Sequence, residues 1–161
     1  MFALASPPRQ VLLIDDYAPC RQTLAWLLRA AGHTVWEAAN GPAGLALLRT
    51  HPVEVLVTDV DMPGLTGWDV ARLVQATHPH VPVVLVTGGG DAGTPERPGP
   101  LVVAAILRKP FGVAEFLALL DGLPRAVNPV VGDTHAGRVG TPTTGMGSVI
   151  VRRATQEASA A

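Results

Sequence analysis

The chain has 161 residues, enough for one domain with a tail, and 48% of them are hydrophobic, enough to build a core. Its formal net charge of −1 gives no electrostatic basis for binding nucleic acid or an acidic membrane surface. The single cysteine, Cys20, excludes an intrachain disulfide and is typical of a reducing compartment. Residues 1–8 lack the features of a signal peptide, and no apolar run approaches the ~18 residues that span a bilayer. A cytoplasmic protein is therefore expected.

The first part of the chain alternates short apolar runs with helical patterns. The expected elements are, in order, a strand at Gln10–Ile14, a helix at Pro19–Ala31, a strand at Thr34–Ala38 and a helix that ends by Pro52. Pro19 suits a first helical position, and Gly32 suits the residue that follows a helix end. Asn40 can cap the second helix through its side-chain oxygen.

The same alternation continues in the next part of the chain. The expected elements are a strand at Glu54–Thr58, a helix capped by Thr66, strands at Val81–Val86 and Ala104–Arg108, and a helix at Val113–Leu120. The segment 88–100 has four glycines before Thr94 and three prolines after it. An interior proline costs a helix about 3 kcal/mol and a glycine about 1 kcal/mol, so this segment is predicted to be a loop or one short helical turn.

Strand and helix in alternation predict right-handed crossovers and a parallel sheet covered by helices on both faces. In such a sheet, ligands bind beyond the carboxyl ends of the strands. Polar residues follow four of the expected strands: Asp15 and Asp16 the first, Asp59 the third, Thr87 the fourth and Lys109 the fifth. We therefore expect three carboxylates, a hydroxyl and an ammonium to gather at one edge of the sheet.

This set of groups is suited to a phosphoryl transfer onto an aspartate. Mg²⁺ prefers oxygen ligands, and a divalent cation relieves the repulsion among neighbouring carboxylates. Asp59 would attack phosphorus in line. Lys109 and Thr87 would then supply a positive charge and a donor to the phosphoryl oxygens. The product would be an aspartyl phosphate.

Several stretches of the chain carry a resemblance to the receiver domains of response regulators in two-component phosphorelay signalling. They are Val11-Leu12-Leu13-Ile14-Asp15-Asp16, Thr58-Asp59-Val60-Asp61-Met62-Pro63-Gly64-Leu65-Thr66-Gly67, Val86-Thr87-Gly88 and Lys109-Pro110-Phe111. The resemblance implies that Asp59 is the phosphoacceptor. It also implies Mg²⁺ ligation by Asp16, Asp59 and the backbone carbonyl of Asp61, with Asp15 acting mainly through water, and a cis Lys109–Pro110 bond.

The resemblance implies a flavodoxin-like, doubly wound α/β fold with a five-stranded parallel sheet of order 2-1-3-4-5, in which the fourth helix is shortened or replaced by a loop. The receiver domain is expected at residues 9–123, after a flexible N-terminus (1–8). The composition after Pro124, rich in Gly, Thr, Pro, Ala and Val without sustained periodicity, predicts a flexible tail or linker at 124–161. The implied phosphoryl donor is a phosphohistidine on a sensor histidine kinase or a histidine phosphotransfer protein. The output would go through contacts with another protein, with no direct binding to nucleic acid or membrane.

One departure from the family concerns Ile106, which occupies the position three before the lysine where the family usually has Tyr or Phe. The usual conformational switch is therefore in question, and a phosphorylation-independent interaction domain is an alternative function. A second alternative is a haloacid-dehalogenase-type phosphatase, in which Asp61 would assist hydrolysis of a phosphoryl group on Asp59. Against it, the acidic pair Asp15–Asp16 comes first in this chain, whereas the additional acidic motif of those phosphatases comes late.

Overall fold

A computed structural model describes residues 7–88 and 101–125. Their strands are β1 (Gln10–Ile14), β2 (Thr34–Ala38), β3 (Val55–Asp59), β4 (Val83–Thr87) and β5 (Ala105–Arg108). All neighbouring strands pair in parallel, in the order β2-β1-β3-β4-β5. The predicted α/β fold with strand order 2-1-3-4-5 is confirmed.

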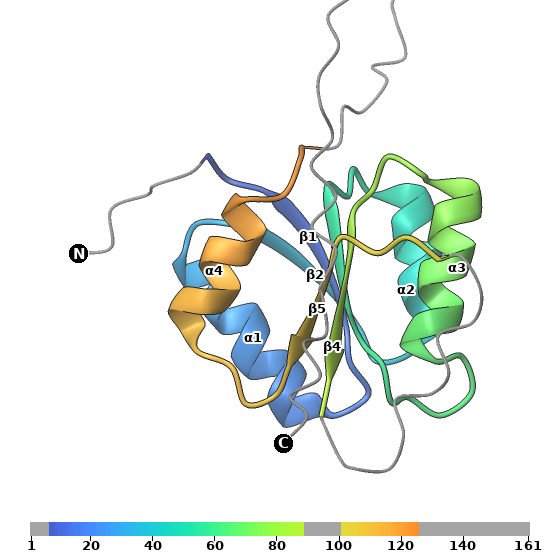
Figure 1. Cartoon of the computed structure of the whole chain (residues 1–161), viewed down its shortest axis with the longest axis horizontal. Helices are drawn as coiled ribbons and strands as arrows, with labels where there is room; N and C mark the ends of the chain where they lie inside the picture. Colours follow the sequence, from blue (N-terminus) through green and yellow to red (C-terminus); the bar gives the residue numbers. More distant parts are fainter. Residues whose placement is uncertain (1–6, 89–100, 126–161) are drawn as a thin grey trace, which may run out of the picture. The chain divides into compact units, whose positions relative to one another are not determined.

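Helices cover both faces of this sheet. They are α1 (Ala18–Ala30), α2 (Gly41–Thr50), α3 (Gly67–Thr77) and α4 (Val113–Asp121). Figure 1 shows α1 and α4 on one face and α2 and α3 on the other, as in a doubly wound sheet. The segment 89–100, predicted to be a loop or a short turn, lies outside the described residues, and so do residues 1–6 and 126–161 of the predicted flexible ends. No described helix has the length and apolar character needed to cross a membrane.

The helix boundaries have local causes that the sequence predicted. The Asn40 side chain accepts a hydrogen bond from the backbone N–H of Ala43, 2.9 Å away, at the start of α2. At the start of α3, Thr66 and Asp69 form a reciprocal capping box, with bonds of 3.2 and 3.0 Å. After α1, Gly32 adopts a positive φ of 92°, which suits glycine best.

Strand β4 begins two residues later than predicted. The carbonyl of Pro82 accepts from Leu56 N–H at 3.0 Å, but proline has no N–H to donate, so the regular ladder starts at Val83. The strand also extends one residue further than predicted, to Thr87, as β3 does to Asp59. Both functional candidates are thus the last residues of their strands.

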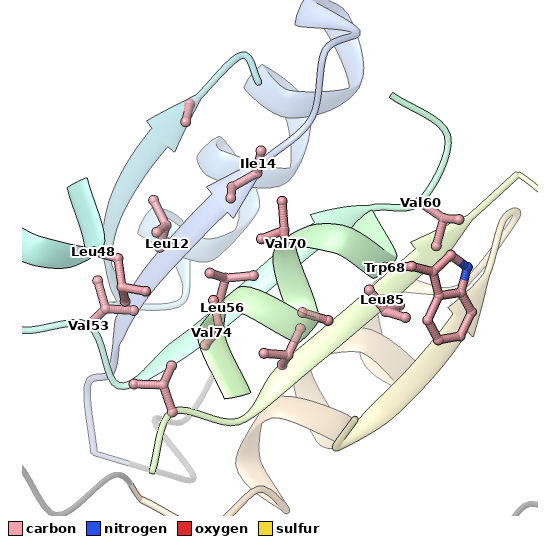
Figure 2. Close-up of a cluster of buried hydrophobic side chains, with 14 of the residues drawn as sticks. Leu12, Ile14, Leu48, Val53, Leu56, Val60, Trp68, Val70, Val74 and Leu85 are labelled. Carbon is pink, nitrogen blue, oxygen red and sulfur yellow. The ribbon is translucent and has the colours of Figure 1, made fainter. Parts of the chain in front are cut away.

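Apolar side chains pack on each face of the sheet and fix the helices against it. The cluster beneath α2 and α3 includes Leu12, Leu56 and Leu85, which are fully buried (Figure 2). Trp68, at the start of α3, lies beside Val60 at one end of this cluster. A second cluster packs between the sheet, α1 and α4. The three central strands, β1, β3 and β4, are therefore buried on both faces nearly throughout.

Candidate functional site

Four of the predicted site residues come together at the carboxyl ends of the strands. Asp59 and Thr87 end β3 and β4, while Asp15 directly follows β1 and Lys109 directly follows β5. The backbone continues this alignment beyond β5, because Lys109 N–H donates to the carbonyl of Thr87 at 2.8 Å. The parallel register thus brings residues from four separate parts of the chain to one edge of the sheet.

The ammonium of Lys109 pairs with two carboxylates. Its Nζ lies 3.1 Å from Asp59 Oδ1 and 3.5 Å from Asp15 Oδ2. Asp15 and Asp59 are only 2% and 7% exposed, so neither charge is well solvated. Two buried carboxylates facing one ammonium leave an excess of negative charge, which favours a further cation.

Burial and neighbouring charges shift the ionisation of this pair. Burial raises the pKa of the Asp59 carboxyl group; Lys109 lowers it, and the charges of Asp15 and Asp61 raise it again, so the pKa lies above its usual range. Burial opposes the charge of Lys109, but the hydrogen bond to Asp59 and the charges of both aspartates outweigh burial and raise the pKa of the ammonium. Lys109 therefore stays charged.

Backbone contacts hold the acidic residues in place. The N–H of Tyr17 donates to Asp15 Oδ1 at 2.8 Å, and the hydroxyl of Thr58 donates to the carbonyl of Asp59 at 3.0 Å. The start of α3 lies directly against β3, so that a Cβ on Gly67 would collide with the backbone carbonyl oxygen of Asp59. The predicted cis Lys109–Pro110 peptide bond is present.

The other predicted metal ligands lie at the surface. The side chains of Asp16 and Asp61 are exposed, whereas Thr87 is buried at 8% exposure. Over residues 7–88 and 101–125, no three His, Cys, Asp or Glu side chains form a metal-binding cluster by themselves. The residues still fit Mg²⁺, since the predicted set includes a backbone carbonyl and water, and the buried carboxylates carry uncompensated negative charge. The Mg²⁺ site remains a prediction.

Two residues near the site were not predicted from the sequence. Cys20 lies on the first turn of α1, where burial and then Asp15 raise the pKa of its thiol. Arg21, the next residue, donates from Nη1 to the backbone carbonyl of Asp15 at 2.7 Å. The only feature of the sequence that places Arg21 near the site is its position in the first turns of the helix that follows Asp15 and Asp16.

The comparisons with known proteins agree with this geometry. The family model described as "Response regulator receiver domain" matches residues 11–121. The chain belongs to this family. The receiver match covers all four residues at the strand ends and both exposed aspartates, and the family acts in two-component signalling.

Two relatives and one solved structure illustrate the match. The chain is 40% identical over 81 residues to the chemotaxis protein CheY of Pseudomonas aeruginosa, covering 48% of this chain and 65% of that protein. It is 29% identical over 126 residues to the probable transcriptional regulatory protein SilR of Salmonella typhimurium, covering 78% and 55%. The structure of CheY4 of Vibrio cholerae superposes with a TM-score of 0.64 at 27% identity, covering 71% and 97%.

The chain thus spans between about half and two thirds of the length of these two relatives.

Within this receiver, the predicted departure from the family at Ile106 can be located in the structure. The Ile106 side chain on β5 is 44% exposed, so an aliphatic group and not an aromatic ring lies at this surface position. Trp68, by contrast, is 5% exposed.

Proposed function

We propose that this receiver accepts a phosphoryl group on Asp59 from a phosphohistidine, carried by a sensor histidine kinase or a histidine phosphotransfer protein. The observation that carries the proposal is the buried Asp59 carboxylate, held 3.1 Å from the Lys109 ammonium, which also pairs with Asp15. A nucleophile and a compensating cation are therefore already in contact. Family membership supports the same assignment.

The placement of these side chains supports the following reaction. A carboxylate oxygen of Asp59 attacks phosphorus, the new O–P bond forms, and the N–P bond of the donor breaks with its electron pair returning to the imidazole. Lys109 holds Asp59 Oδ1 before attack, so we assign Oδ2 as the attacking oxygen. Lys109 then balances the charge on the transferred oxygens, and the Thr87 hydroxyl donates to one of them.

Asp16, Asp59 and the carbonyl of Asp61 would hold Mg²⁺, with Asp15 contributing through water. When bound, the ion supplies positive charge to the phosphoryl oxygens and screens the carboxylates from one another. The response regulator TrrA of Thermotoga maritima shares this fold, with a TM-score of 0.62 at 20% identity over 70% of this chain and 96% of that one. It was solved in complex with Mg²⁺-BeF, which supports the choice of cation.

Acetyl phosphate provides the test, because it needs no identified kinase. Wild type and Asp59→Asn are incubated with acetyl phosphate in Mg²⁺ or in EDTA, and the adduct is read by intact mass and Phos-tag gel. We expect a phosphoryl adduct on wild type that requires Mg²⁺ and is absent from Asp59→Asn. No adduct on a folded, Mg²⁺-binding wild type would count against this activation and in favour of a phosphorylation-independent interaction domain.

The output is proposed to pass through contacts with another protein. The chain covers only part of relatives such as SilR, so the partner and any effector attached to the receiver are not identified by the match. We propose no direct contact of residues 9–123 with nucleic acid, since the net charge of the chain is −1. We propose residues 124–161 as a tail or linker.

A further inference from the structure

The side chain of Arg21 connects the acidic loop, Asp15 and Asp16 after β1, to the edge strand β2. Its Nη1 donates to the backbone carbonyl of Asp15 at 2.7 Å. Its Nε lies 3.6 Å from Oε2 of Glu37, on β2. The Arg21 side chain is 16% exposed, so its guanidinium is partly shielded from water. One side chain thus bridges the end of β1, the start of α1 and the neighbouring strand.

The contact between Arg21 and the Asp15 carbonyl lies where the acidic loop leaves the sheet. The last ladder bond of this region runs from Asp15 N–H to the carbonyl of Ala38, at 3.2 Å. The Asp15 carbonyl belongs to the next peptide unit, which leads into Asp16 and has left the ladder. Within the part of the chain that the structure describes, this carbonyl accepts a hydrogen bond from Arg21. The orientation of this peptide unit determines the position of the Asp16 Cα atom, from which the exposed Asp16 side chain extends.

We propose that Arg21 is a positioning residue for the divalent-cation site, holding the Asp15–Asp16 peptide against Glu37 so that both carboxylates face the cation. The inference rests on the proposed function, because it assigns a role toward the Mg²⁺ of that site. Partners of metal ligands act in this way in general, by fixing the orientation of groups that touch the ion. Arg21 itself touches neither Asp59 nor the phosphoryl group in this assignment.

Charge and positioning make opposite predictions for Arg21. A guanidinium near a cation site repels the cation, so its removal on electrostatic grounds alone would strengthen Mg²⁺ binding. If Arg21 holds the loop, its removal weakens Mg²⁺ binding instead. The sign of the change therefore separates the two effects.

The chain provides a matched control in Arg29. Its Nη1 lies 2.8 Å from Oε1 of the same Glu37, and its Nη2 donates to the carbonyl of Val35 at 2.9 Å. Arg29 is thus an arginine of the same helix that pairs with the same carboxylate, but its backbone partner is on β2 and not on the acidic loop. Its side chain is 51% exposed, and exposed ion pairs contribute little to stability.

The experiment measures the Kd for Mg²⁺ by calorimetry on the full chain, for wild type, Arg21→Met, Arg21→Lys and Arg29→Met. We expect Arg21→Met to raise the Kd about tenfold, the lower range for loss of a partner of a metal ligand. Arg29→Met should leave the Kd unchanged. Arg21→Lys keeps the charge and an N–H donor group but lacks the planar guanidinium, and its Kd should fall between those of Arg21→Met and wild type. In acetyl phosphate labelling, Arg21→Met should need more Mg²⁺ but reach the wild-type rate at saturation.

Thermal unfolding in EDTA separates positioning from folding. A Kd for Arg21→Met at or below that of wild type, in a protein with wild-type unfolding, would overturn the inference. If Arg21→Met does not fold, Glu37→Gln replaces it, since it frees the guanidinium from β2 and should also raise the Kd. An unchanged Kd in that variant would overturn the inference equally. Wild type that fails to bind Mg²⁺ would overturn the proposed function and this inference together.

Discussion

The carboxylate of Asp59 and the ammonium of Lys109 lie 3.1 Å apart although 50 positions separate them in the chain. Asp59 is the last residue of β3 and Lys109 directly follows β5, and β4 lies between these two strands in the sheet. The pair therefore depends on the parallel order of three strands. Because Asp15 shares the same ammonium at 3.5 Å, any change to Lys109 alters the balance of charge on two buried acids.

Lys109→Met is expected to slow phosphorylation strongly. The variant removes the only ammonium that contacts Asp15 and Asp59 among the described residues. Loss of one preorganised group that balances transition-state charge costs on the order of 100-fold in rate. The rate of adduct formation with acetyl phosphate at saturating Mg²⁺ measures the effect. Lys109→Arg keeps the charge and should retain more activity than Lys109→Met; equal rates for the two variants would contradict a charge-based role.

Asp59→Asn is expected to raise the Tm in EDTA at pH 7. Burial holds the pKa of Asp59 above its usual value of 3.8, so the folded protein resists ionisation of this group more than the unfolded chain does. Stability from this group is complete below pH 3.8 and is lost as pH rises through the higher folded pKa. The variant has no such loss.

The measurement is a Tm series from pH 4 to pH 7.5, with EDTA throughout. The gain of Asp59→Asn over wild type should grow with pH. A gain that is constant across pH would show that ionisation of Asp59 is not its cause.

The sequence allowed the fold and the centre of the site to be predicted for a common reason. Five strand-length apolar runs each lead into a turn, and parallel pairing brings those turns to one edge, so Asp59, Thr87 and Lys109 could be grouped without coordinates. Element ends were less predictable. Strand β4 starts at Val83 because Pro82 cannot donate to the ladder, an effect that hydropathy does not register.

The support around the site could not be predicted in the same way. Arg21 meets Glu37 only because α1 packs beside β2, and a long side chain gives no sign in the sequence of which partner it will meet. The approach of Gly67 to the Asp59 backbone depends on how closely α3 packs. Both contacts follow from tertiary packing and not from local pattern.

Gly67→Ala is expected to destabilise the protein and impair the site. An added Cβ would collide with the Asp59 carbonyl oxygen and lie 2.9 Å from Val60 Cα, and neither backbone atom can rotate away. Overpacking of this kind costs about 1–3 kcal/mol. Urea unfolding gives the free energy, and acetyl phosphate labelling gives the effect on Asp59.

The matched control for this change is Gly112→Ala. Gly112 has a φ of −77° and no atom within 4 Å of an added Cβ. Its substitution should leave labelling unchanged and alter stability by less than that of Gly67. If both variants behave alike, close packing of α3 on β3 is not what fixes Asp59.

Stability is also expected to fall in acid because of His33, at the end of the sheet where β1 begins. The backbone N–H of Arg9 donates to His33 Nδ1 at 3.1 Å, so this nitrogen must be unprotonated. Burial is the largest cause and lowers the pKa of His33; the charge of Asp121 raises it, Arg9 and Arg125 lower it, and Glu54 raises it, so the pKa lies below its usual value. The unfolded chain therefore binds a proton more readily than the folded protein.

For His33, stability is complete above the usual pKa of 6.5 and declines as pH falls from 6.5 toward the lower folded pKa. Urea unfolding of wild type between pH 7.5 and pH 5 should show this decline. His33→Asn keeps a side-chain acceptor near Arg9 N–H but does not titrate in this range, so its stability should change less with pH. Burial, His80 and Arg49 also lower the pKa of His78, which is less buried than His33, so His78→Asn should reduce the slope too, but by less. A wild-type slope in His33→Asn would assign the acid sensitivity to other groups.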